Sequence, residues 1–119
     1  MEGFAVSKRK IVAIITDALG DRVVVGEEEL LHSISKHFKN LPVDIMLELI
    51  ERILKDPTDV FKDESVNERV FNFFYKLESR SRFIVAVVKI NPDGAFFSSA
   101  YPTGSKPRNI HKKLKKVKI

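Results

Sequence analysis

Two histidines, His32 and His37, are the side chains of this chain best suited to proton transfer near neutral pH. The third histidine, His111, falls in a basic C-terminal segment. Two hydroxyl groups, those of Ser99 and Tyr101, fall near the end of a predicted strand, where they could bind a phosphate oxygen. Imidazoles, hydroxyls and an excess of lysine together favour phosphodiester chemistry on RNA.

The helix predicted around the histidines determines where each of them points. At about 100° per residue, His37 projects close to Leu30, at the border of the buried stripe. His32 points toward the more polar side of the helix, where Lys36 is adjacent to it. A histidine at the rim of a core can reach into a groove over the sheet, where burial and neighbours tune it for proton transfer. The alternative is a boundary histidine that is only hydrogen-bonded.

Several other chemistries find no support in the sequence. His32 and His37 do not share a helix face as an i, i+4 zinc-binding pair would. The chain has no cysteine, which excludes disulfides, thiolate nucleophiles and cysteine-ligated zinc. Neither a GxGxxG motif nor a phosphate-binding P-loop occurs, and Ser98 and Ser99 lack the flanking glycines of a nucleophile elbow. We therefore expect no cofactor and no metal.

Alternation along two predicted strands sorts further candidates onto faces. On strand 95–101, Ser99 and Tyr101 share a face with Phe97, and ordinary strand-end polarity is the alternative reading of their hydroxyls. On strand 68–77, one face carries Arg69, Phe71, Phe73 and Tyr75, and the other carries Val70, Asn72, Phe74 and Lys76. Aromatic side chains beside basic ones can stack nucleic-acid bases. The alternative is that these phenylalanines belong to the core.

The positive charge is concentrated at the C-terminus. The net charge is +5, and residues 105–119 contain seven Lys or Arg and no acid. The preceding 104 residues carry 14 basic and 16 acidic groups, so this part of the chain is slightly acidic. Lys106 and Arg108 belong to the basic segment, which we expect to attract phosphates in a salt-dependent way. A solvated or solubilising end is the alternative.

Length and patterning indicate one domain over residues 1–104, followed by the basic tail 105–119. No apolar run approaches the roughly 20 residues needed to span a bilayer. The apolar run from Ile11 to Ile15 is too short for a signal-peptide core, so we expect a cytoplasmic protein without a membrane partner.

The periodicity predicts an α+β fold in which N-terminal helices pack on one face of a four- to five-stranded antiparallel meander sheet. Gly20 is the expected C-terminal stop of the first helix, and Asn91–Gly94 forms the clearest turn. The predicted elements are helices at 8–19, 27–38 and 43–54, a short strand at 21–25, and four strands at 58–63, 68–77, 82–90 and 95–101.

Several motifs between Leu31 and Thr103 occur in a familiar order. Two histidines lie five residues apart on a helix. The segment Asp56–Val60 (DPTDV) is similar to an N-P-D-x-V turn, although it is one residue longer, and the segment Ser99–Thr103 (SAYPT) is similar to a terminal T-A-Y-x-T, with serine in place of threonine. Over about 70 residues the chain resembles the phage-associated branch of the barnase–EndoU–colicin–RelE-like (BECR) ribonuclease superfamily.

The resemblance implies a BECR-like fold and a metal-independent endoribonuclease, toxin-like or derived from a phage. Attack of a ribose 2′-OH on the adjacent phosphate would give a 2′,3′-cyclic phosphate. In this hypothesis His37 and His32 transfer protons, Lys76 or Arg69 neutralises developing charge, and hydroxyls hold the scissile phosphate. The expected catalytic residues are His37, His32, Ser99, Tyr101 and Lys76, and the expected RNA-binding residues are Lys36, Arg69, Thr103, Lys106 and Arg108.

A second hypothesis comes from another class of function. A module of phage origin could keep this fold without catalysis and bind nucleic acid or a protein partner. The protein partner would be an antitoxin or a phage structural protein. This hypothesis predicts binding that depends on the tail and tolerates loss of both histidines.

Overall fold

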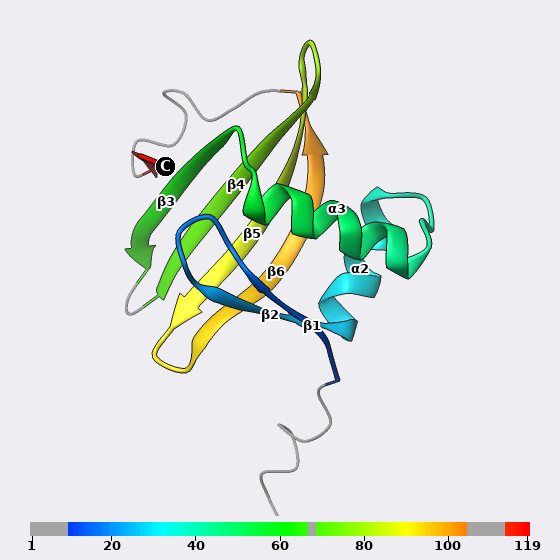
Figure 1. The fold of residues 1–119 in the computed structure, drawn as a ribbon, viewed down its shortest axis with the longest axis horizontal. Coiled ribbons are helices and arrows are strands. Elements are labelled where there is room, and N and C mark those ends of the chain that lie inside the picture. The colour runs from blue at the N-terminus through cyan, green and yellow to red at the C-terminus, as the bar shows by residue number, and fades with distance from the viewer. Residues whose placement is uncertain (1–9, 67–68, 105–113) are drawn as a thin grey trace, which may run out of the picture.

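A mixed seven-stranded sheet and two helices make up the part of the chain that the computed structural model describes, residues 10–66, 69–104 and 114–119 (Figure 1). The elements are β1 (Ile11–Thr16), β2 (Arg22–Gly26), α2 (Glu27–His37), α3 (Val43–Lys55), β3 (Asp59–Val66), β4 (Arg69–Ser79), β5 (Arg82–Asn91), β6 (Gly94–Thr103) and β7 (Leu114–Val117). The strand order is β1-β2-β6-β5-β4-β3-β7. Neither described helix is long and apolar enough to cross a membrane.

The predicted fold class, N-terminal helices on a four- to five-stranded antiparallel meander, is wrong. The meander itself is present, since β3, β4, β5 and β6 pair successively in antiparallel fashion. However, the sheet is larger and mixed, because β2 pairs in parallel with β6 and β1 pairs with β2. At the opposite edge β7, which lies within the predicted basic tail, pairs with β3.

The largest local difference is the first predicted helix, which is a strand followed by a tight turn. The β-branched residues of β1 pair with β2 in an antiparallel hairpin, and such residues fit a pleated surface better than a helix. Asp17 closes the turn, because its Oδ1 accepts hydrogen bonds from the backbone N–H groups of Leu19 (2.9 Å) and Asp21 (3.0 Å). Gly20, with φ +94, supplies the left-handed turn position and does not end a helix.

Asp17 makes the stability of this hairpin depend on pH. Burial raises the pKa of its carboxyl group, which is 5% exposed, above the usual 3.8. The folded state therefore holds the proton more tightly than the unfolded state, and this contribution to stability is lost as the pH rises through the raised pKa. Asp17→Asn keeps the Oδ1 acceptor and removes the charge. We expect urea unfolding from acidic to neutral pH to show the wild type losing stability relative to this variant, and parallel curves would contradict the assignment.

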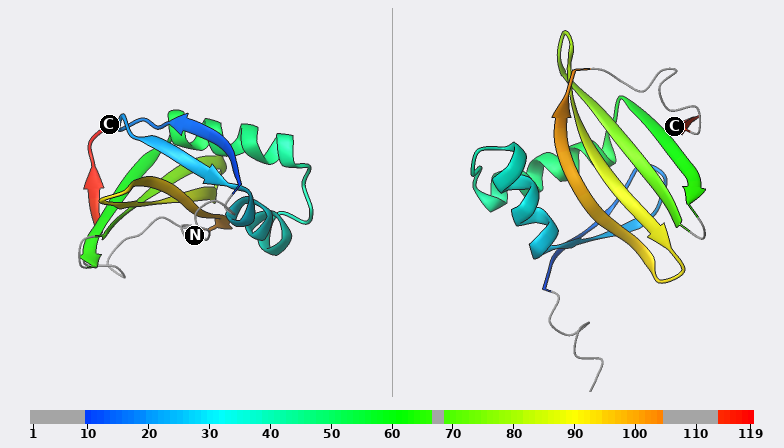
Figure 2. Two further views of the ribbon diagram at one scale, coloured as in Figure 1. Left: turned by 90° about the horizontal axis from the view of Figure 1, so that it is seen from below. Right: turned by 180° about the vertical axis from the view of Figure 1, so that it is seen from behind.

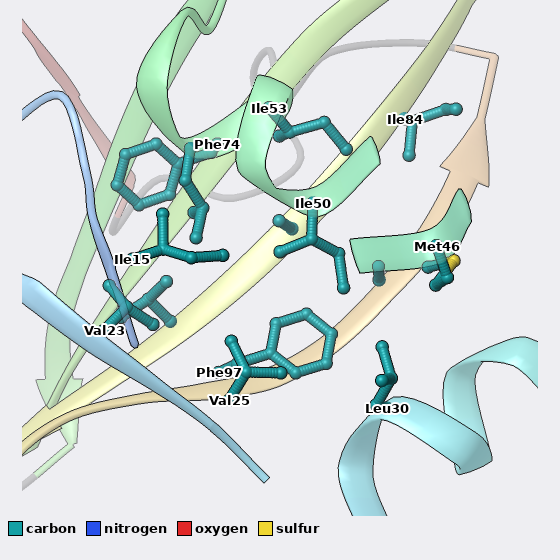
Figure 3. Packing of buried hydrophobic residues seen from close by; sticks show 14 of the residues in the cluster. Ile15, Val23, Val25, Leu30, Met46, Ile50, Ile53, Phe74, Ile84 and Phe97 are labelled. Atoms are coloured by element: carbon teal, nitrogen blue, oxygen red, sulfur yellow. The ribbon is translucent and has the colours of Figure 1, made fainter. Parts of the chain in front are cut away.

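The main core lies between the meander and the layer formed by α3 and the β1–β2 hairpin (Figure 3). Met46, Ile50 and Ile53 of α3 point onto the sheet and are fully buried. Phe74 of β4 and Phe97 of β6 meet them from the sheet. Phe74 is therefore a core residue. This was one of the two alternatives predicted for the phenylalanines of β4.

The opposite face of the meander is covered by neither described helix (Figure 2). A second, smaller cluster lies there, built around Tyr75, Val85 and Val87. We call this surface the open face. Its partly buried aromatic residues are Phe61, Phe71, Phe73, Phe83 and Tyr101.

Candidate active site between helix α2 and strand β6

Helix α2 lies along β6 where β6 has no further strand partner among the described residues. The parallel pairing of β2 with β6 covers Val23–Ala95 and Val24–Phe96 and then ends. Because α2 follows β2 directly, it runs on beside β6 in the place where β2 stops. The buried Ser33 Oγ accepts a hydrogen bond from the backbone N–H of Ala100 at 3.1 Å. This bond replaces one that a neighbouring strand would supply and fixes the position of the helix.

Removing this hydroxyl is expected to destabilise the protein. Ser33→Ala would leave the buried Ala100 N–H without its acceptor, which costs about 1–3 kcal/mol. Ser35→Ala is the matched control, since Ser35 is exposed on the same helix and an exposed serine contributes little. Chemical unfolding of both variants measures the difference. Equal stabilities of the two variants would show that Ser33 does not anchor α2.

A β-bulge at Ser98 changes which residues of β6 share a face. Val88 is opposite Phe97 and Val87 is opposite Ser99, so Ser98 is the extra residue. The predicted sharing of one face by Phe97, Ser99 and Tyr101 is therefore wrong. Phe97 is buried in the main core, whereas Ser99 and Tyr101 lie opposite Val87 and Val85 on the open face.

At the C-terminal end of α2, His37 meets Tyr101. Their ring centroids are 6.0 Å apart and the rings are nearly perpendicular, at 89°. His37 is otherwise exposed. Burial raises the pKa of the Tyr101 phenol, and burial together with Tyr101 raises the pKa of Tyr75 to about 12. At neutral pH the Tyr101 hydroxyl is therefore protonated and can donate a hydrogen bond.

Nearer the start of α2, His32 lines a pocket of about 320 Å³ together with Glu28, Glu29 and Ser98. Glu29 and Ser98 also line an adjoining pocket of about 90 Å³, to which Lys89 of β5 contributes. The two adjoining pockets are thus lined by residues of four chemical types: a histidine, His32, a glutamate, Glu29, a lysine, Lys89, and a serine, Ser98. Both histidines of α2 lie beside the short segment 98–101 of β6.

Glu29 and Lys89 were not among the predicted site residues. Lys89 is the one charged residue between Phe83 and Ile90, an otherwise apolar strand, and this interruption could have pointed to it. Glu29 had a weaker signal, because three acids in a row at the start of a helix are explained by the helix dipole. Oε1 of Glu29 lies over Gly26, where a Cβ would displace it.

Lys76 does not lie with the other candidates. It is opposite Ile84, a residue of the main core, and so lies on the helix-covered side of the sheet. Its Nζ donates to the backbone oxygen of Asp56 at 2.6 Å and to Oδ2 of Asp56 at 3.0 Å. The ion pair joins β4 to the end of α3.

The remaining predicted residues are divided between the described and the undescribed parts of the chain. Lys36 is exposed on α2, one turn beyond His32. Thr103 ends β6 and lies opposite Phe83 on the open face. Arg69 begins β4, but its side chain lies outside the described part. Lys106 and Arg108 also lie outside the described residues.

The chain matches a family of known proteins. A family model described as phage-Barnase-EndoU-ColicinE5/D-RelE like nuclease2 matches residues 1–119, which is the whole chain. No curated protein and no solved structure matches significantly. Among the described residues, no three His, Asp or Glu side chains form a group that could hold a metal ion.

Proposed function

Because the chain belongs to this phage-associated BECR-like nuclease family, we propose that it is an endoribonuclease whose active site lies between α2 and segment 98–101 of β6. The membership confirms the resemblance drawn from the histidine pair and the SAYPT segment. The observation that carries the proposal is the contact between these two motifs, since the His37 ring meets the Tyr101 ring.

The proposed reaction uses a nucleophile that the substrate itself contains. A base takes the proton of the ribose 2′-OH, and the 2′-oxygen forms a bond to the adjacent phosphorus. The bond from phosphorus to the 5′-oxygen breaks, and an acid gives that oxygen a proton. The products are a 2′,3′-cyclic phosphate and a free 5′-OH. Because acid–base groups suffice for these proton transfers, the reaction does not require a metal.

The two histidines are the groups we assign to proton transfer. His37, which lies beside the phenol of Tyr101, is the first choice. His32 lines a pocket with Glu29 and Ser98, so a carboxylate is available to orient its ring. Glu29 itself is an additional candidate base. Whether one or both histidines transfer protons is decided by the single and double variants.

Lys89 takes the role that Lys76 had in the hypothesis from sequence. Lys89 lines the pocket shared with Glu29 and Ser98, and we propose that its ammonium group neutralises the charge that develops on the phosphate. The hydroxyls of Ser99, Tyr101 and Thr103 follow one another along the open face of β6. We propose that they hold phosphate oxygens at successive positions of the RNA strand, with Ser99 and Tyr101 nearest the scissile phosphate. Lys36, one turn beyond His32, would contact a neighbouring phosphate.

The test compares RNA with DNA of the same sequence in the presence of EDTA. The wild type should cleave the RNA and leave the DNA intact, because DNA lacks the 2′-OH. A His32→Ala, His37→Ala double variant that remains folded by circular dichroism should be inactive. Cleavage of DNA, or a requirement for added magnesium, would contradict the proposal. Binding without cleavage that survives loss of both histidines would favour the non-catalytic binding module.

A further inference from the structure

The open face carries more aromatic surface than the proposed chemistry uses. Phe61, Tyr75 and Phe83 come from three neighbouring strands, β3, β4 and β5. The Phe61 and Tyr75 ring centroids are 5.5 Å apart, and those of Tyr75 and Phe83 are 6.1 Å apart, both edge to face. Such contacts hold the rings in place. Phe71 and Phe73 extend this array along β4 and are only partly buried.

The array is continuous with the proposed active site. Across the sheet, Ser99 lies opposite Val87, and Val87 lies opposite Phe73. Phe73 in turn lies opposite Phe61 of β3. With neighbouring strands about 4.8 Å apart, Phe73 is about 10 Å from the β6 hydroxyls. The valine side chains of β5 that lie between the two are buried, and the Phe73 ring packs against this cluster while remaining partly exposed.

Lys89 places a positive charge on one side of the array, and charges of both signs lie on its other side. Lys89 lies opposite Phe71 on one side and opposite Phe96 on the other, at the pocket of the proposed site. At the far edge, Lys116 of β7 lies opposite Phe61, and its Nζ is 3.3 Å from Oδ1 of Asp59. The two charges of this ion pair offset each other, and Asp63 of β3, which lies opposite Phe71, places a further acid at this edge. Aromatic surface with a lysine at the border nearest the proposed site is complementary to a nucleic-acid strand, whose bases stack and whose phosphates are anionic.

We propose that this array is a stacking platform for unpaired bases of the substrate strand. The rings available for stacking are those of Phe61, Phe71, Phe73 and Phe83, which are partly exposed, whereas Tyr75 is buried among them and supports them. The inference rests on the proposed function, which places the scissile phosphate at β6. Bases beyond that phosphate would lie across β5 onto β4. A base can stack on these rings only when it is free of its own duplex, so the substrate is single-stranded RNA. Stacking is tolerant of sequence because every base has an aromatic face.

The test measures binding separately from cleavage. Full-length protein carrying His37→Phe is titrated with a short single-stranded RNA containing one 2-aminopurine, whose fluorescence is quenched by stacking. The same RNA as a duplex and the same sequence as single-stranded DNA are titrated in parallel. We expect quenching and similar affinity for both single strands, and binding of the duplex at least tenfold weaker. This experiment measures binding and quenching, which need no cleavage. A failure of the stacking inference can therefore be distinguished from a failure of the proposed function, which is tested by cleavage.

Phe73→Leu and Phe71→Leu keep an apolar side chain and remove the aromatic ring. Each should weaken single-strand binding roughly 5- to 100-fold and reduce the quenching. The loss should be similar from about 50 to 200 mM salt, whereas loss of a cation would change the salt dependence. Phe38→Leu is the matched control, since Phe38 is partly buried against the main core and should leave binding unchanged.

Two results would overturn the inference. One is equal affinity for duplex and single strand. The other is affinity and quenching within twofold of the parent in both phenylalanine variants while the proteins remain folded. The second result would mean that the array is a minor core or that it is covered by another protein.

Discussion

His37→Ala is expected to slow RNA cleavage by about 10²–10⁴-fold, the range typical of a general acid–base group. RNA affinity should barely change, because the substrate is held by other groups along β6 and by the lysines. Stability should fall by no more than about 1.5 kcal/mol, since the change removes one exposed ring and its edge contact with Tyr101. Single-turnover cleavage rates and unfolding curves measure the two effects separately.

His37→Phe separates proton transfer from ring packing. The phenylalanine keeps the edge-to-face contact with Tyr101 but cannot transfer a proton. Cleavage by this variant should therefore be as slow as that of His37→Ala, with stability nearer to the wild type. Recovery of activity in His37→Phe would show that the histidine acts only by packing. His32→Ala should cost a comparable factor if the two histidines act as an acid–base pair, and less if His32 only orients the substrate.

Lys89→Met is expected to reduce cleavage by about 10²–10³-fold, the effect of removing one group that stabilises developing charge. Lys76→Met is the matched control, because both lysines lie on central strands but on opposite faces of the sheet. Lys76 is bound to Asp56, so its loss should lower stability slightly and leave cleavage unchanged. Cleavage rates at saturating RNA measure the difference.

The reverse pattern, a large loss of activity for Lys76 and none for Lys89, would contradict the placement of the active site. Far-ultraviolet circular dichroism of both variants is the control for folding. A loss confined to RNA affinity in Lys89→Met would show that this lysine binds the substrate strand without acting on the reacting phosphate.

The central part of the fold could be predicted from local sequence. Alternation and the Asn91–Gly94 turn predict the meander, and the nearly unbroken apolar character of β5 indicates an inner strand. The edges of the sheet could not be predicted in this way. Residues 11–16 have both helical spacing and β-branched side chains, and their pairing with β2 decides between the two. The pairing of β7 with β3 joins segments about 50 residues apart, which no local pattern records.

The site, like the fold, was predictable only where a local motif records it. Motif order pointed to the two histidines and the SAYPT segment, and His37 does meet Tyr101. The cation could not be chosen from the pattern, because Lys76 and Lys89 lie on opposite faces and strand register decides which face holds the site. The bulge at Ser98 is likewise invisible to simple alternation, and it moves Ser99 and Tyr101 to the open face.

The chemical ends of the cleavage products test the central claim most directly. A short RNA of defined sequence is cleaved by the wild-type protein in EDTA, and the fragments are identified by mass spectrometry. Attack by the 2′-OH predicts a 2′,3′-cyclic phosphate on the upstream fragment and a 5′-OH on the downstream fragment. A 3′-OH paired with a 5′-phosphate would show that water, and not the ribose, attacks the phosphorus, and would contradict the mechanism.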